Sequence, residues 1–458
     1  MAKKIQHPKI VILGAGSLFF GRQAIWQMVH SPYLNHGTLA LVDTDAERMA
    51  KMGRLAEMVI ADQKVPLKLE FSINRKNVLE EADFVVLSFA KQTVKYRGMD
   101  CQVSKKYGVR MCSGDTIGPG GVFRAMREFP VILEVIEDVR KFCPTAWVIN
   151  YINPTAVHGI GLFRYAPDIK SFALCDGLHL PYVKQRYALD AGIISSTAEY
   201  TDELDRNFDL RIAGVNHFTF ILKAEYKGQD VLPAIAATIR RAALQENSDS
   251  DAKAVFNAKI TDTLYQIFGV LPACTAHTKE YLPYWQGKGV LKDIIPPLKI
   301  WETEPRYQAH AEMFKQVDDF ISGRIPISNF MMTFGPDHAT DIIESMVGNL
   351  GKPFYINTPN RGAVTNMHDD AFLELCSDIS LEGIQPRPVG EMPRGIRGYQ
   401  ELVLDTHELT AEAIYKCDKN LLRRAILTDP IVNSIADGDA ILEELLIQER
   451  DALPDGWF

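Results

Sequence analysis

Short apolar runs that alternate with helical stretches dominate the first 190 residues. The run Lys9–Leu13 is apolar and rich in β-branched residues, ends at a glycine turn, and is followed by a helical stretch over Arg22–Val29. Strands that alternate with helices in this way are typical of a doubly wound, parallel sheet. The sequence therefore predicts an α/β fold. The later strand-like runs are Thr38–Val42, Phe84–Ser88, Ala146–Ile149 and Ser171–Leu174.

The pattern changes beyond about Asp190. A polar stretch over Thr201–Phe208 is followed by longer helical stretches such as Asp251–Phe268 and His310–Ile321. We place a domain boundary at this change, which gives an N-terminal domain over residues 1–190 and a mixed α+β domain over residues 191–458. Because no long linker separates them, the two parts are expected to pack around one site.

Composition restricts the partners and the compartment. The formal charge of −8 over 458 residues argues against a nucleic-acid binder, which would need a basic stripe. The seven cysteines are scattered from Cys101 to Cys417 without a CxxC pair, which is typical of a reducing compartment. No signal peptide and no membrane span are indicated. We therefore expect a cytoplasmic protein with a small-molecule ligand.

The glycine turn after the first strand predicts a nucleotide site. Gly14 and Gly16 stand between a strand and a helix, where backbone N–H groups can bind a pyrophosphate, and Ser17 follows them. Asp43 ends the next strand, where a carboxylate can accept hydrogen bonds from ribose hydroxyls and repel a 2′-phosphate. This pattern favours a Rossmann-type domain that binds NAD. Phe19 takes the place of the third glycine, so an ordinary glycine turn capped by Ser17 is the alternative.

A second glycine cluster, residues 114–124, precedes the helical stretch Ala125–Lys141. Its adjacent glycines and its proline at a helix entrance suit a close approach of the backbone to a ligand. Arg124 at its end can contact an anionic or hydroxyl-rich group. A plain tight loop is the alternative interpretation.

Polar residues follow three predicted strands, at the edge of the sheet where open α/β folds bind ligands. A thiolate from Cys175 and an imidazole from His217 can bind a divalent transition metal, with substrate and water completing its shell. Each residue alone is ambiguous, because a lone cysteine is usually a small core residue and a lone histidine is often structural. The three pairs are Asn150 with Asn153, Cys175 with Asp176, and Asn216 with His217.

These motifs together resemble glycoside hydrolase family 4, whose members are NAD- and metal-dependent glycosidases related in fold to lactate and malate dehydrogenases. The resemblance runs from about residue 8 to about residue 393. It implies that Cys175 and His217 hold a metal, usually Mn²⁺, and that Asn153 contacts sugar hydroxyls; we add Arg124 and Asn216 as substrate-binding candidates. The motifs, in order, are Gly14-Ala-Gly-Ser17, Asp115-Thr-Ile-Gly-Pro-Gly-Gly-Val-Phe-Arg124, Asn150-Tyr-Ile-Asn-Pro154, Cys175-Asp176, Gly214-Val-Asn-His217 and Gly383-Ile-Gln-Pro386.

The resemblance also implies a mechanism without net oxidation. NAD⁺ takes a hydride from C3 of the sugar, a base removes the C2 proton, the C1–O bond breaks by elimination, water adds, and the hydride returns. Asp176 is the candidate acid, because several α-specific members of the family carry an acid at this position. The resemblance therefore favours an α-glycoside. The base is expected in the segment Ala273–Tyr284, where Tyr281 ranks before His277 and Tyr284 because a nearby cation can lower the pKa of a phenol.

Departures from the family pattern suggest a divergent branch or a sister family. Arg394 and Arg397 can bind a carboxylate, sulfonate or phosphate, which points to an acidic sugar such as a glucuronide, galacturonide or sulfoquinovoside. They can equally form a solvated surface. An NAD-dependent sugar or 2-hydroxy-acid dehydrogenase and a nucleotide-bound regulatory protein are the alternatives. We expect a homodimer or homotetramer.

Overall fold

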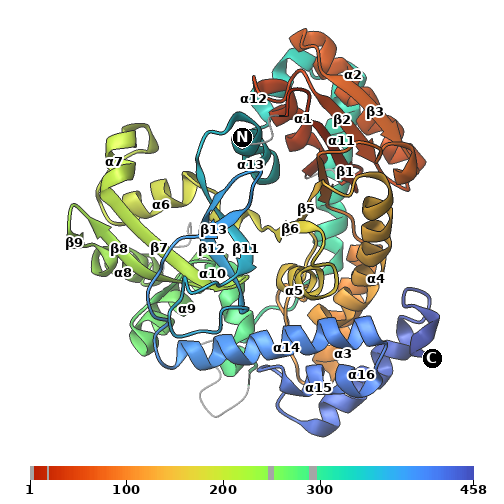
Figure 1. The fold of residues 1–458 in the computed structure, drawn as a ribbon. Helices are drawn as coiled ribbons and strands as arrows, with labels where there is room; N and C mark the ends of the chain where they lie inside the picture. Colours follow the sequence, from red (N-terminus) through yellow and green to blue (C-terminus); the bar gives the residue numbers. More distant parts are fainter. Residues whose placement is uncertain (1–4, 18–19, 246–251, 288–296) are drawn as a thin grey trace.

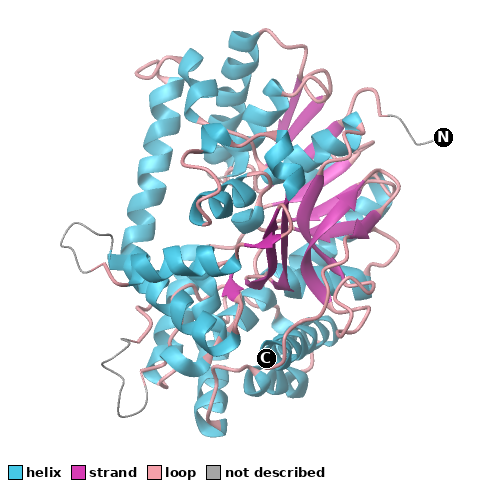
Figure 2. Ribbon diagram, turned by 90° about the vertical axis from the view of Figure 1, so that its left-hand side faces the viewer, coloured by secondary structure: helices cyan, strands magenta, loops and turns pink. Residues whose placement is uncertain are grey.

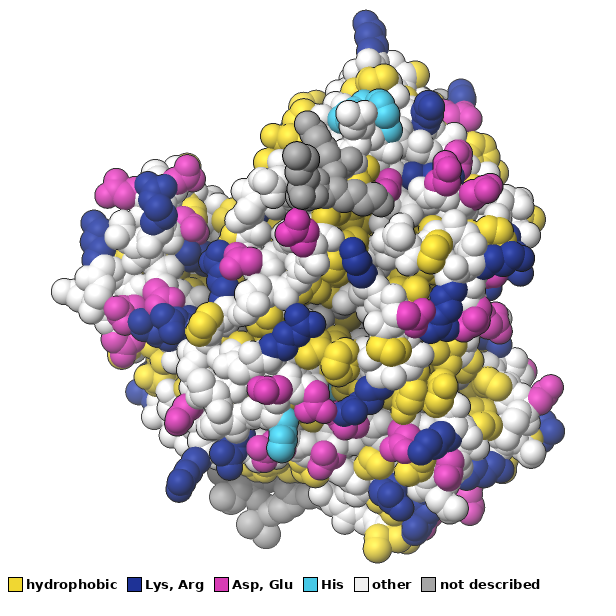
Figure 3. Space-filling view, in the orientation of Figure 1, with side chains coloured by type: hydrophobic (Ala, Val, Ile, Leu, Met, Phe, Trp, Pro, Cys, Tyr) yellow, Lys and Arg dark blue, Asp and Glu magenta, His cyan; other side chains and the backbone are white. Residues whose placement is uncertain are grey.

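The computed structural model describes residues 5–17, 20–245, 252–287 and 297–458. Within these residues, one mixed sheet of 13 strands runs through the molecule with helices on both faces (Figures 1 and 2). None of the helices described is both long and apolar enough to cross a membrane. Lysine, arginine and acidic side chains are interspersed over the face shown in Figure 3.

The N-terminal half contributes the parallel strands, in the order β3-β2-β1-β4-β5-β6. The strand order reverses between β1 and β4, which is where open α/β sheets bind ligands. The strands predicted from the sequence are present, with ends within one residue of those expected. The bounds are β1 Lys9–Leu13, β2 Thr38–Val42, β3 Lys68–Ser72, β4 Phe84–Leu87, β5 Trp147–Asn150 and β6 Lys170–Ala173.

Alternate side chains of these strands enter two separate cores, one on each face of the sheet. Val85 and Leu87 of β4 pack into the core beneath the long helix α4, whereas Phe84 and Val86 pack into the core on the other face. Burial on both faces explains why these strands are continuously apolar in the sequence. The covering helices are α1 Phe20–His30, α2 Ala46–Gln63, α3 Thr93–Lys106, α4 Gly118–Phe142 and α5 Thr155–Tyr165.

The C-terminal half extends the same sheet with antiparallel strands, in the order β6-β11-β12-β7-β8-β10. β11 and β12 come late in the chain but lie between β6 and β7. The division into domains at residue 190 stays a prediction. The bounds are β7 Phe208–Val215, β8 Phe218–Tyr226, β9 Gln229–Asp230, β10 Leu271–Pro272, β11 Pro353–Pro359, β12 Phe372–Ile379 and β13 Ile384–Pro386.

Helices from the C-terminal half fold back onto the N-terminal half. α11 packs against α2 and α3, and α14 crosses from β7 to α4 and α5 (Figure 1). The buried Arg127 of α4 forms ion pairs with Asp100 of α3 and with Glu449 just after α16, which ties the C-terminal helices to the sheet. The bounds are α6 Tyr182–Asp190, α7 Asp202–Asn207, α8 Leu232–Ala243, α9 Ala252–Phe268, α10 Thr275–Thr278, α11 Thr303–Ile321, α12 Phe330–Thr333, α13 His338–Gly348, α14 Ile396–Lys416, α15 Lys419–Thr428 and α16 Ile435–Gln448.

Candidate active site

A cleft of about 990 Å³ runs along the carboxyl ends of β1, β2, β4 and β5. One wall is formed by residues at the ends of these strands and of β3, from residues 73–75 through the glycine turn to Asn153, and His277 also lines the cleft. The opposite wall is one face of α11, because its lining residues recur three or four positions apart. The lining residues of α11 are Arg306, His310, Met313 and Phe314.

The glycine turn fits a dinucleotide. Gly14 has a φ of 91°, a backbone conformation that favours glycine. The Gly16 N–H donates to Asp43 Oδ2 over 2.9 Å, and a Cβ at Gly16 would lie 2.5 Å from the same oxygen, so a larger residue would displace the Asp43 side chain. The turn is closed by a hydrogen bond of 2.8 Å from the Ser17 N–H to the Gly14 carbonyl. Phe19 lies outside the described residues.

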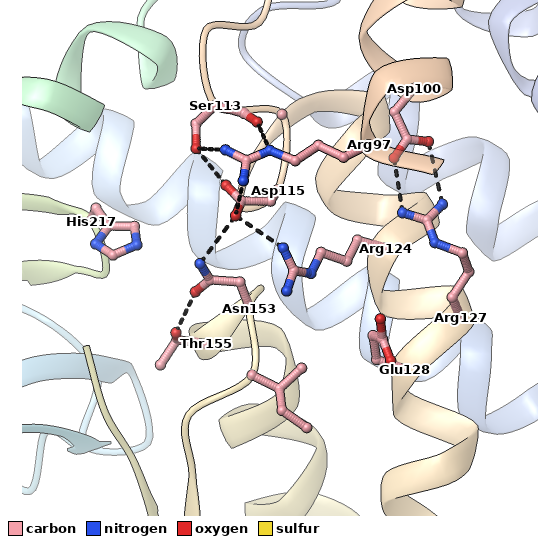
Figure 4. A network of polar contacts seen from close by, with 12 residues as sticks. Arg97, Asp100, Ser113, Asp115, Arg124, Arg127, Glu128, Asn153, Thr155 and His217 are labelled. Atoms are coloured by element: carbon pink, nitrogen blue, oxygen red, sulfur yellow. Dashed lines mark hydrogen bonds and ion pairs between the residues drawn. The ribbon is translucent and has the colours of Figure 1, made fainter. Parts of the chain in front are cut away.

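Asp115 organises the middle of the cleft (Figure 4). Its Oδ2 accepts hydrogen bonds from Arg124 Nη1 at 3.0 Å and from Asn153 Nδ2 at 3.3 Å, and it lies 3.2 Å from Arg97 Nη1. Burial alone would raise the pKa of the Asp115 carboxyl, but the guanidiniums of Arg97 and Arg124 lower that pKa well below its usual range. Asp115 is therefore ionised and fixes Asn153 and two arginines in place.

Cys175 and His217 come together as the metal hypothesis requires. Cys175 follows β6, His217 lies in the turn between β7 and β8, and Cys175 Sγ is 3.0 Å from His217 Nδ1. Burial lowers the pKa of His217 to about 3, so its ring is neutral and keeps a lone pair for a metal. A thiol and a neutral imidazole fit a divalent transition metal and leave open positions on it.

A buried carboxyl supports this pair from β12. Asn216 Nδ2 donates to Glu374 Oε2 over 3.1 Å and lies 3.2 Å from His217 Nδ1. Burial raises the pKa of the Glu374 carboxyl to about 7. Asn216, predicted to bind substrate, is itself buried and makes these contacts within the protein. Its role toward substrate stays a prediction.

The three candidate bases occupy different environments. The Tyr281 hydroxyl donates to the Asn216 carbonyl at 2.8 Å and accepts from the His217 N–H at 2.9 Å, and burial raises its pKa well above the ordinary value. His277 lines the cleft, with its ring centroid 4.4 Å from that of His217, and burial lowers its pKa. Tyr284 is exposed, and its hydroxyl lies 3.0 Å from the hydroxyl of Tyr399.

The candidate acid Asp176 follows Cys175 directly, whereas the two candidate anion-binding arginines lie outside the cleft lining. Asp176 begins a short 3-10 helix, Asp176–Leu178, and its side chain is outside what the structure describes. Arg394 is exposed just before α14, and Arg397 in its first turn has Nε 3.4 Å from Glu401 Oε1. Both arginines lie outside the cleft lining.

Sequence patterns did not identify Arg97 or Glu280 as site residues. Glu280 Oε1 accepts hydrogen bonds from the N–H groups of Ser113 at 2.9 Å and Gly114 at 2.8 Å, so it shapes the loop that carries Asp115. Burial raises the pKa of Glu280 to about 7. Glu280 stands next to Tyr281 in the segment expected to hold the base, and this position is the one sequence feature that could have identified it. Arg97 belongs to no motif.

Full-length relatives are glycosidases. The chain is 27% identical to an alpha-galacturonidase of Thermoanaerobacter italicus and covers 99% of each protein. It is 26% identical to an alpha-galactosidase of Bacillus subtilis, over 98% of this chain and 99% of the relative. Relatives with different substrates are thus about equally similar, and this similarity leaves the sugar open.

Solved structures show the same fold. A 6-phospho-alpha-glucosidase from gut microorganisms, in complex with NAD and Mn²⁺, has a TM-score of 0.80 at 21% identity and covers 98% of this chain and 99% of its own. A malate dehydrogenase of Cryptosporidium parvum has a TM-score of 0.50 at 11% identity over 90% of this chain and 99% of its own. The predicted dehydrogenase-like α/β fold is therefore confirmed.

Family models match both halves of the chain. The model described as Family 4 glycosyl hydrolase matches residues 9–185, and the model described as Family 4 glycosyl hydrolase C-terminal domain matches residues 212–432. The resemblance drawn from the ordered motifs is confirmed, and the chain belongs to glycoside hydrolase family 4.

Proposed function

We propose that this protein hydrolyses an α-glycoside by transient NAD-dependent oxidation at C3, with elimination across C1 and C2, and that it uses a divalent metal such as Mn²⁺. One observation carries the proposal. The glycine turn lines the same cleft as Asn153 and His277, and the His277 ring lies 4.4 Å from the ring of the metal-ligand candidate His217. The reactive end of a bound dinucleotide would thus lie beside the metal pair.

The chain's own residues would orient the sugar. When bound, NAD⁺ would supply the acceptor for the C3 hydride and the metal would supply a Lewis acid. Asn153 would hold sugar hydroxyls in one orientation, since Thr155 Oγ1 donates to its Oδ1 over 2.7 Å and Asp115 accepts from its Nδ2. Cys175 and His217 would hold the metal next to those hydroxyls.

We assign the proton transfers to two residues. Asp176, next to Cys175, would protonate the leaving oxygen, in line with an α-glycoside. His277 is better placed than Tyr281 to remove the C2 proton, because His277 lines the cleft and the Tyr281 hydroxyl is already hydrogen-bonded to the backbone of residues 216 and 217. Tyr281 then serves to position His217.

A panel of nitrophenyl glycosides tests the proposal. The α- and β-galactosides, galacturonides, glucuronides, 6-phosphoglucosides and sulfoquinovosides should be assayed with NAD⁺ and Mn²⁺ under reducing conditions. We expect release of nitrophenol from one α-glycoside without net NADH, because the hydride returns in each cycle. Stoichiometric NADH without release of nitrophenol would instead indicate a sugar or 2-hydroxy-acid dehydrogenase. The homo-oligomeric state and cytoplasmic location remain predictions.

A further inference from the structure

We propose that Arg306, on α11, binds an anionic group of the substrate sugar, so that the cleft is specific for a sugar with a carboxylate. This inference rests on the proposed function, because it places a glycoside at the end of the cleft.

The position of Arg306 along α11 sets it at the sugar end. Phe314, which lines the same cleft, has the Arg48 guanidinium 4.9 Å from its ring centroid, near the end where Asp43 would hold the ribose. Arg306 precedes Phe314 by two helical turns, roughly 12 Å. The charges near Arg306 are those of Arg97 and Asp115, and the Arg97 guanidinium lies 4.7 Å from the ring centroid of Trp301.

The charges at this end leave Arg306 without a counter-ion. Arg97 donates through Nε and Nη2 to Ser113, and its Nη1 faces Asp115, so each of its three guanidinium nitrogens has a partner within the protein. Asp115 also forms an ion pair with Arg124. Within the described part of the chain, Arg306 has no hydrogen bond or ion pair. Arg306 is exposed to solvent although it lines the cleft, and partial burial and then the nearby positive charge of Arg97 lower its pKa.

A carboxylate on the sugar would fit this environment. The planar guanidinium pairs with a carboxylate through two parallel hydrogen bonds. The oxyanion could also come from the pyrophosphate of the dinucleotide. The position of Arg306 near Arg97, two helical turns from Phe314 and the Arg48 guanidinium, favours the sugar as the source.

Arg306→Gln tests the proposal, with Arg397→Gln as the matched control. The control removes the same charge from a site outside the cleft lining and also tests the role the sequence suggested for Arg397. For Arg306→Gln we expect kcat/KM for nitrophenyl α-galacturonide to fall about 10- to 100-fold, mainly through KM. The kcat/KM for nitrophenyl α-galactoside and the Kd for NAD⁺ should change less than about threefold.

Other outcomes would overturn the proposal. A weakened affinity for NAD⁺ with an equal loss on both glycosides would assign Arg306 to the pyrophosphate. A wild-type enzyme that prefers the galactoside would show that the cleft does not select an acidic sugar. Loss of activity on the galacturonide in Arg397→Gln alone would place the carboxylate-binding residue outside the cleft.

A binding measurement separates this inference from the proposed function. Calorimetric titration of D-galacturonate, D-glucuronate and D-galactose into enzyme with NAD⁺ and Mn²⁺ needs no turnover. We expect an acid to bind more tightly than galactose, and Arg306→Gln to remove the difference. If this holds while no glycoside is hydrolysed, the proposed function fails and the anion site stands. If glycosides are hydrolysed but no acid binds through Arg306, the anion site alone fails.

Discussion

Cys175 Sγ lies 3.0 Å from His217 Nδ1, although 42 residues separate them in the chain. The strands that precede them, β6 and β7, are not neighbours in the sheet. β11 and β12 lie between them, and Ala173, Asn357, Glu374 and Gly214 are successive register partners across the four strands. The thiol, the imidazole and the supporting carboxyl of Glu374 are thus brought together by one line of register partners across these four strands.

Replacing the thiol should separate metal binding from nucleotide binding. We expect Cys175→Ser to lose most Mn²⁺-dependent turnover and Mn²⁺ affinity, because a hydroxyl is a poor substitute for a thiolate ligand. NAD⁺ affinity and the melting temperature should stay close to wild type. Cys417→Ser, at an exposed cysteine, is the control. Wild-type affinity for Mn²⁺ in Cys175→Ser would move the metal site elsewhere.

The carboxyl behind Asn216 should tune metal affinity. Glu374→Leu removes the acceptor for Asn216 Nδ2, and loss of such a supporting contact typically weakens metal binding about 10- to 100-fold. Glu374→Gln keeps an acceptor and should restore most of the affinity. Titration of Mn²⁺ followed by electron paramagnetic resonance measures both variants. Equal affinities in the two variants would assign Glu374 a purely structural role.

The ribose contact gives a third prediction. Asp43→Ala should weaken NAD⁺ binding by about 1–3 kcal/mol, since it removes hydrogen bonds to the ribose. It also removes the acceptor for the Gly16 and Asp45 N–H groups, which lie 2.9 Å from its two oxygens. Fluorescence titration with NAD⁺ measures the change, with Asp62→Ala on the exposed end of α2 as control. Unchanged affinity would mean that the ribose lies elsewhere.

The sequence predicts the fold best where local chemistry decides the structure. Lys9–Leu13 and Thr38–Val42 are strands over the whole predicted range, because both are buried on two faces and therefore read as continuous apolar runs. β3, Lys68–Ser72, was not predicted. It is an edge strand with no buried residue, so it leaves no apolar run in the sequence.

The site is predictable only where a motif marks it. Cys175 and His217 follow strand ends, and the family resemblance pairs them. Arg306 has no local signal, since it enters the cleft only because α11 folds back against α2 and α3. The sequence likewise cannot rank Tyr281 and His277 as the base, because they lie four residues apart in the chain and differ only in their burial and tertiary contacts.

A buried histidine far from the cleft should make stability depend on pH. Burial lowers the pKa of His407 on α14 to about 3. In the unfolded chain His407 has a pKa of roughly 6.5, so below that pH the unfolded chain binds a proton that the folded chain does not. The contribution of His407 to the free energy of unfolding is therefore fully present above about pH 6.5 and is lost as the pH falls. Between pH 7.5 and 5.0, this amounts to roughly 2 kcal/mol.

Urea unfolding of His407→Leu at these two pH values tests the assignment. The pH-dependent loss of unfolding free energy should be smaller than in wild type by that amount. His368→Leu, at an exposed histidine, should keep the wild-type difference. An unchanged pH difference in His407→Leu would show that the ring is not buried in its neutral form.

Deuterium incorporation tests the elimination step itself. Only elimination breaks the C2–H bond, so hydrolysis in heavy water should place deuterium at C2 of the released sugar, provided that the base exchanges its proton with solvent. Nuclear magnetic resonance of the product measures the label. Product without deuterium at C2, from an enzyme whose base exchanges with solvent, would exclude elimination even if NAD⁺ proved essential.

Two variants identify the base in the same reaction. His277→Asn should lose exchange and turnover together and keep its affinity for NAD⁺ and Mn²⁺, because His277 lines the cleft and our proposal assigns the metal to Cys175 and His217. Tyr281→Phe should keep measurable exchange and bind Mn²⁺ more weakly, because its hydroxyl holds the backbone N–H of His217 at 2.9 Å. The reverse pattern, with exchange lost in Tyr281→Phe at unchanged Mn²⁺ affinity and retained in His277→Asn, would make Tyr281 the base and would require its hydroxyl to leave the two backbone groups of residues 216 and 217 when substrate binds.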